Sequence, residues 1–126
     1  MNNNYRSEKR KIIKIITKNL NDIYKSGKEI CNEWDKNTIP LNLLHTIIDK
    51  AKPSPLQRKQ EKSLDAYANT LDSLELALNK IATNMDSKSV PLSELLKGLK
   101  IIKTAFIGEW NRIDEEKAKT NLIKKQ

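Results

Sequence analysis

Apolar residues recur at alternating steps of three and four along most of this chain. The clearest run comprises Leu64, Tyr67, Leu71, Leu74, Leu78, Ile81 and Met85. This spacing places the side chains on one stripe of an α-helix, the pattern by which one helix packs lengthwise against another. Strand signals are almost absent, since no Asn-Gly or Asp-Gly turn separates alternating apolar runs. The pattern therefore predicts an all-α fold.

The first two helices are bounded by capping residues and prolines. Ser7 is expected to cap a helix that runs to about Trp34. Gly27 falls on its apolar stripe, which indicates a close helix approach; the alternative is a bend that divides the helix there. Pro40 suits the first position of a short second helix, and Pro53 ends it.

Two further long helices follow. Ser54 and Gln57 form a capping-box pattern that begins a third helix, which is expected to continue to Met85. Pro91 opens a fourth helix, whose stripe is formed by Leu92, Leu95, Leu99, Ile102, Phe106, Trp110 and Ile113. The Glu-Trp pairs at 33–34 and 109–110 are interpreted as a coincidence of helix ends rather than as a duplication.

These segments predict one domain over residues 1–126, an elongated antiparallel helical bundle of three long helices and one short helix. Residues 1–6 and about 115–126 are expected to be flexible ends, because the periodic pattern fades there. Some apolar residues lie off the main stripes and either widen the core or form a second interface, which makes a homo-oligomer possible: Ile12, Ile15, Leu43, Leu76, Leu96, Ile101 and Ile107.

Residues suited to catalysis or metal binding are sparse. Cys31 and His45 fall on different predicted helices and have no third partner at a useful spacing. Cys31 is expected to be a buried thiol and His45 to lie at the core margin. The carboxylates at 114–116, and Asp72 with Glu75, lack the Glu-x-x-His pairs of di-metal bundles. We therefore expect no enzyme activity, no cofactor and no metal site.

The single cysteine favours a reducing compartment, because it cannot form an internal disulfide. No apolar run approaches the roughly 18 residues that a membrane span requires. A cytoplasmic location is the simplest expectation from these two observations.

Basic residues are the chain's main functional signal, because the formal net charge is +8. They gather in three groups, the first near the N-terminus. The candidate anion-binding or partner-binding residues are Arg6, Lys9, Arg10, Lys11, Lys14 and Lys18; Arg58, Lys59 and Lys62; and Lys97, Lys100 and Lys103. Arginine, which reads bases and phosphates bidentately, is scarce beside lysine, and this weakens a sequence-specific nucleic-acid function.

Two functions are consistent with these observations. The first is a non-enzymatic helical interaction protein, an adaptor, inhibitor or assembly subunit, that binds a protein partner through an exposed helical face and could also self-associate. The second is a nucleic-acid-binding accessory protein that uses the basic N-terminal helix. The sequence does not show whether the three basic groups share one face.

Overall fold

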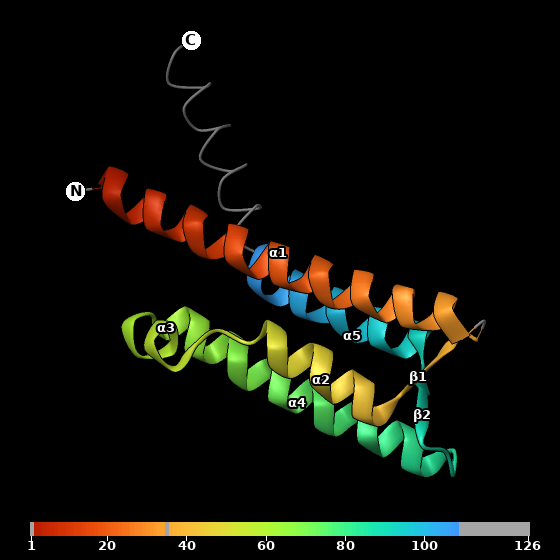
Figure 1. Cartoon of the computed structure of the whole chain (residues 1–126). Coiled ribbons are helices and arrows are strands. Elements are labelled where there is room, and N and C mark those ends of the chain that lie inside the picture. The colour runs from red at the N-terminus through yellow and green to blue at the C-terminus, as the bar shows by residue number, and fades with distance from the viewer. Residues whose placement is uncertain (1, 35, 109–126) are drawn as a thin grey trace.

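The computed structural model describes residues 2–34 and 36–108 (Figure 1). Its helices are α1 (Asn2–Trp34), α2 (Leu41–Ala51), α3 (Pro55–Gln60), α4 (Lys62–Asn84) and α5 (Leu92–Lys103), and a π-helix, η1 (Thr104–Gly108), continues α5. Two three-residue strands, β1 (Thr38–Pro40) and β2 (Ser89–Pro91), precede α2 and α5. The all-α class is confirmed, and the two strands are an addition that the sequence patterns did not predict.

The two strands form an antiparallel ladder at one end of the bundle. Ile39 pairs with Val90 at its centre, and both side chains are completely buried. The β-branched pair suits a strand, and the flanking prolines are tolerated because each strand has only one partner. Pro40 and Pro91 have extended backbone angles and precede the helices as N-cap residues, so the expectation that Pro40 occupies the first helical position is wrong.

The ladder joins two similar units, α1–β1–α2 and α4–β2–α5. Corresponding residues lie 51 positions apart, as Leu41 does from Leu92 and Leu44 from Leu95. Two backbone hydrogen bonds at the ends of the ladder obey the same offset: Leu41 N donates to Lys88 O over 3.0 Å, and Leu92 N donates to Asn37 O over 2.8 Å. The antiparallel register therefore relates the units by a local twofold axis through the central strand pair.

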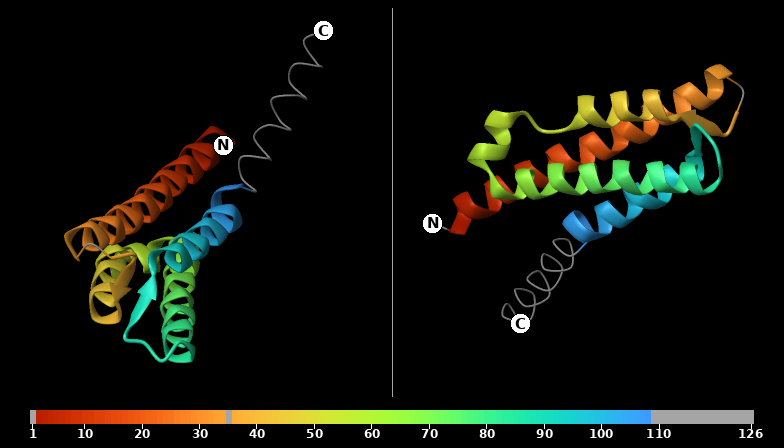
Figure 2. Two further views of the ribbon diagram at one scale, coloured as in Figure 1. Left: turned by 90° about the vertical axis from the view of Figure 1, so that its right-hand side faces the viewer. Right: turned by 90° about the horizontal axis from the view of Figure 1, so that it is seen from below.

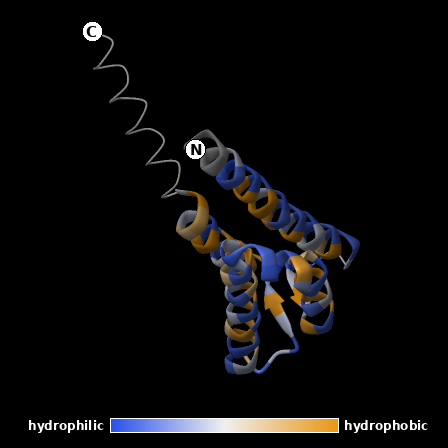
Figure 3. Ribbon diagram, turned by 90° about the vertical axis from the view of Figure 1, so that its left-hand side faces the viewer, coloured by the Kyte–Doolittle hydropathy of each residue, from blue (hydrophilic) through white to orange (hydrophobic). Residues whose placement is uncertain are grey.

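Each of the long helices α1 and α4 packs against both α2 and α5 (Figures 1 and 2). Figure 3 shows hydrophobic and hydrophilic stretches alternating along the helices, as expected for helices with one apolar face. Gly27 lies inside an unbroken α1, and a Cβ there would come within 3.0 Å of Leu95 Cδ2 and 3.1 Å of Ile39 Cδ1. The predicted close approach at Gly27 is confirmed. The central core comprises Ile16, Ile23, Leu44, Ile48, Tyr67, Leu71, Leu78 and Leu95.

Helix boundaries differ from the expectation at two places. α1 begins at Asn2, so Ser7 lies within the helix and does not cap it. The predicted third helix is divided at Glu61, whose φ of −136° and ψ of 111° are extended, and this break separates α3 from α4. The predicted capping box is confirmed, because Ser54 N donates to Gln57 Oε1 over 3.0 Å and Gln57 N donates to Ser54 Oγ over 3.2 Å.

The ends of the apolar stripes also depart from the prediction. Trp34 and Met85, which are 51 residues apart, are 59% and 57% exposed, and each stands where a long helix ends before the ladder. Cys31 rather than Ile30 is fully buried near the end of the α1 stripe.

The π-helix changes which residue of the fourth stripe enters the core. A π turn spans five residues rather than four, so the residue after Ile102 on the buried line is Ile107, which is 5% exposed. Phe106, the expected core residue, is only partly buried. Trp110, Ile113 and the segment 115–126 lie outside the described residues.

Candidate functional site

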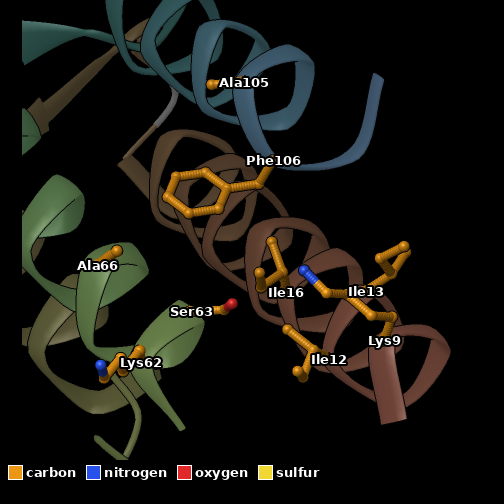
Figure 4. Close-up of a pocket in the computed structure, with 9 residues that line it drawn as sticks. All are labelled: Lys9, Ile12, Ile13, Ile16, Lys62, Ser63, Ala66, Ala105 and Phe106. Atoms are coloured by element: carbon orange, nitrogen blue, oxygen red, sulfur yellow. The ribbon is translucent and has the colours of Figure 1, made fainter. Parts of the chain in front are cut away.

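An apolar groove of about 320 Å³ lies at the end of the bundle opposite the ladder. Its walls come from α1, α4 and η1, which are far apart in the sequence (Figure 4). The groove is lined by Lys9, Ile12, Ile13, Ile16, Lys62, Ser63, Ala66, Ala105 and Phe106.

The sequence of each wall explains the hollow. The adjacent isoleucines 12–13 and 15–16 give α1 a stripe wider than one core can cover, so Ile13 remains only partly buried beside the buried Ile12 and Ile16. The facing positions on α4 are Ser63 and Ala66, whose side chains are too short to close the gap. Small residues opposite large ones therefore leave the hollow open.

Phe106 forms a third side of the groove because of the π-helix. Its ring meets the buried Tyr67 edge to face, with ring centroids 5.8 Å apart and planes at 81°. This contact fixes the orientation of Phe106 along the groove wall. The apolar periodicity predicts Phe106 in the core, and no local signal in the sequence indicates the π turn that moves it.

The apolar surface extends beyond the groove over Ala105. Ala105 also lines a second hollow of about 370 Å³, together with Lys100, Ile101 and Thr104. Ile101 is 70% exposed. The two hollows therefore meet at Ala105, and together they are here called the groove and its Ile101 shelf.

One lysine from each predicted basic group borders this surface: Lys9, Lys62 and Lys100. Figure 4 shows the Lys9 nitrogen directed over the hollow, whereas the Lys62 nitrogen points away from α1. Among the described residues, the lining of the two hollows contains no Asp or Glu. The surface is thus apolar at its floor and positive at its rim.

The other basic candidates do not join this surface. Lys11, Lys14 and Lys18 are exposed on the face of α1 opposite its buried stripe, and Arg10, Lys59 and Lys103 are also exposed. Arg58 Nε donates to Asp65 Oδ1 over 2.8 Å, and Lys97 Nζ lies 3.4 Å from Glu94 Oε1. Arg6 belongs to α1, but its side chain lies outside the described part of the chain. Each of the three basic groups therefore contributes one lysine to this surface, and the groups do not form one continuous basic strip.

A separate polar network ties α2 to α4. Lys52 Nζ contacts Asp49 Oδ1 at 2.8 Å, Glu75 Oε1 at 3.0 Å, and Asp72. Burial opposes the charge of Lys52, but its hydrogen bonds to these carboxylates outweigh that effect and raise its pKa. The bond from Lys52, helped by Glu75, lowers the pKa of Asp49. From the sequence, Asp72 and Glu75 are recognisable only as a pair of carboxylates that could be considered for metal binding. Their partners on α2 are distant in sequence, so the ion pairs are not predictable from it.

His45 and Cys31 are both held by neighbouring groups. His45 Nδ1 lies 3.0 Å from Glu75 Oε2, and its Nε2 lies 3.3 Å from Asn79 Oδ1. Cys31 is 5% exposed, its Sγ lies 3.6 Å from Thr38 O, and burial raises the pKa of its thiol. The expectations of a buried thiol and of a histidine at the core margin are confirmed.

In the part of the chain that the structure describes, no group of three or more His, Cys, Asp or Glu is placed to hold a metal ion. Over the same residues, no helix combines the length and the apolar character that crossing a bilayer demands. Comparison of the chain with protein-family models, with curated proteins and with solved structures finds no match in any of the three.

Proposed function

We propose that this chain is a non-enzymatic interaction protein that binds a protein partner through the groove and its Ile101 shelf. The observation that carries the proposal is the hollow between α1, α4 and η1, where isoleucine and phenylalanine side chains line an open surface instead of closing a core. Exposed apolar surface that is continuous and rimmed by polar groups is characteristic of protein-binding sites.

The dimensions of the surface favour a protein over a small ligand. Pockets for small molecules have volumes of about 300–1,000 Å³ and bury most of their ligand. The groove, at about 320 Å³, is at the lower limit, and its lining residue Ala105 also borders a second hollow of similar size. Two neighbouring hollows could each receive a side chain that projects from a larger partner.

The environments of the two most reactive side chains support a role without catalysis. Both ring nitrogens of His45 are occupied by Glu75 and Asn79, and the Cys31 thiol is buried. Neither residue lines the groove. A cytoplasmic location belongs to the same proposal and rests on the single cysteine.

Site-specific photo-cross-linking tests the proposal. A photo-cross-linking amino acid replaces Ser63 inside the groove in one variant, and the exposed Leu76, elsewhere on α4, in a matched control. In cells of the native host, position 63 should give a discrete protein adduct and position 76 should not. An adduct of twice the chain's mass would identify the partner as a second copy.

The substitution Ile13→Asp should reduce the adduct from position 63 by about tenfold or more, because burial of an isoleucine side chain contributes about 1.5–3 kcal/mol to an interface. A circular dichroism melt checks that the variant remains folded. Equal adducts from positions 63 and 76, or none from position 63, would show that the groove is not the binding site.

A second candidate function is nucleic-acid binding, and one observation favours it. Lys11, Lys14 and Lys18 are exposed at steps of three and four, so they form an outward line along α1 that could follow a phosphate backbone. This line is separate from the groove, and the two functions can therefore be tested by different substitutions.

A further inference from the structure

We infer that the partner element bound by the groove is an amphipathic helix with carboxylates on both sides of its apolar stripe. The inference rests on the proposed function and specifies the class of partner for the same surface. It follows from three features of the groove: the kind of wall, the length of the apolar floor and the sign of the charge at the rim.

The walls exclude an extended peptide as the bound form. They are formed by helices, whose backbone groups are already bonded along their own axes, so an added strand would find no partner for its backbone. The strands β1 and β2, which pair with each other, lie at the opposite end of the molecule (Figure 1). A helix satisfies its own backbone and can bind such a groove by side chains alone.

The spacing of the floor fits a helix of two to three turns. The lining residues of α1 follow steps of three, one and three from Lys9 to Ile16, and those of α4 run from Lys62 to Ala66. The α1 wall therefore extends for about 10 Å. A helix laid between these walls presents side chains at i, i+3, i+4 and i+7 over the same distance.

The charge of the rim selects an acidic partner. Lys62 on α4 and Lys100 on α5 border different hollows of the surface, and its lining contains no carboxylate among the described residues. On α4, Asp65 is paired with Arg58, whose Nε lies 2.8 Å from Asp65 Oδ1, so the negative charge of Asp65 is offset. Carboxylates on the two flanks of a bound helix would attract the long, flexible side chains of Lys62 on α4 and Lys100 on α5, and basic flanks would be repelled.

The test uses the full chain and two synthetic peptides of about 18 residues, or roughly 27 Å of helix. Both carry the same leucine stripe, flanked by glutamates in one peptide and by lysines in the other. Binding is measured by fluorescence anisotropy at several salt concentrations. The glutamate peptide should bind about tenfold or more tightly than the lysine peptide at low salt, and the difference should narrow as salt screens the rim.

Charge substitutions locate the effect on the protein. The double variant Lys62→Glu with Lys100→Glu should weaken the glutamate peptide about tenfold or more. The control is Lys36→Glu with Lys88→Glu, which makes the same change in net charge at exposed positions beside the ladder and should have little effect. Equal loss in both double variants would overturn the inference, because binding would then follow total charge.

A third probe is a short DNA duplex, with the triple variant Lys11→Gln, Lys14→Gln and Lys18→Gln. Tight duplex binding that this triple variant abolishes, without peptide binding, would overturn the inference and favour the nucleic-acid function.

If neither peptide binds but the adduct from position 63 forms, the partner class is wrong and the proposed function stands. If peptides bind but no adduct forms, the proposed cellular function fails instead.

Discussion

The hydroxyl of Tyr67 is buried without a hydrogen-bond partner among the described residues. Its ring has no exposed surface and packs against Phe106 beside the groove. An unsatisfied buried polar group costs about 1–3 kcal/mol, yet the ring itself fills a large volume in the core. Burial also raises the pKa of Tyr67, because the phenolate cannot be solvated there.

Tyr67→Phe should therefore raise the free energy of unfolding by about 1 kcal/mol at neutral pH. In the parent chain the raised pKa contributes stability below pH 10.0, where an unfolded tyrosine is neutral. That stability is lost as pH rises further, by up to about 1.4 kcal/mol per pH unit, and the variant should lack this loss. Urea unfolding at neutral and alkaline pH measures both effects. Tyr24→Phe, at a partly buried position, is the control and should change little.

Among the elements, α2 and α4 are joined by more than apolar packing. Lys52 at the end of α2 collects carboxylates from both helices, while its own side chain is only 19% exposed. Glu75 is 15% exposed and also contacts His45. A network of this kind is worth more than an isolated surface pair, because its members are partly desolvated and already ordered.

Lys52→Met should destabilise the fold by about 1–3 kcal/mol, since it leaves Glu75, Asp49 and Asp72 without their shared cation. The lowered pKa of Asp49 means that its share of the stability is present above pH 3.8 and is lost as pH falls through the folded-state value. The difference from the parent chain should thus shrink in acid. Chemical unfolding from neutral to acidic pH checks this.

Lys97→Met provides the comparison for Lys52→Met. It removes an exposed pair with Glu94 within one helix and should change stability by less than about 0.5 kcal/mol. An equal effect of the two substitutions would contradict the assignment of Lys52 as the tie between α2 and α4.

At the scale of the whole molecule, the predictable features are those that depend on periodicity within one element. Leu64, Leu71 and Leu78 are buried as their spacing predicts, because a long helix has only one stripe to place in a core. The ladder and the groove depend instead on distant partners. Ile39 becomes a strand residue because Val90 lies opposite, and Phe106 reaches the groove because of a π turn. Neither cause is visible in a short window of sequence.

The two-unit architecture predicts that neither half is stable alone. The apolar stripe of α1 is covered by α5 as well as by α2, and β1 has only β2 as a partner. Separate fragments of residues 1–53 and 54–126 should each show weak helical circular dichroism, and an equimolar mixture should recover cooperative unfolding. A native-like melt of residues 1–53 alone would mean that the units are independent domains.

The ladder has a mechanical consequence for the opposite end of the molecule. It holds the two units together at one end, and α1 is closely packed near that end because Gly27 lies against Leu95 and Ile39. From there to Ile13 the helix extends about 21 Å. A tilt of α1 by about 5° about Gly27 would therefore move the groove wall by roughly 2 Å. The width of the groove would thus depend on the packing around Gly27, at residues that do not line the groove.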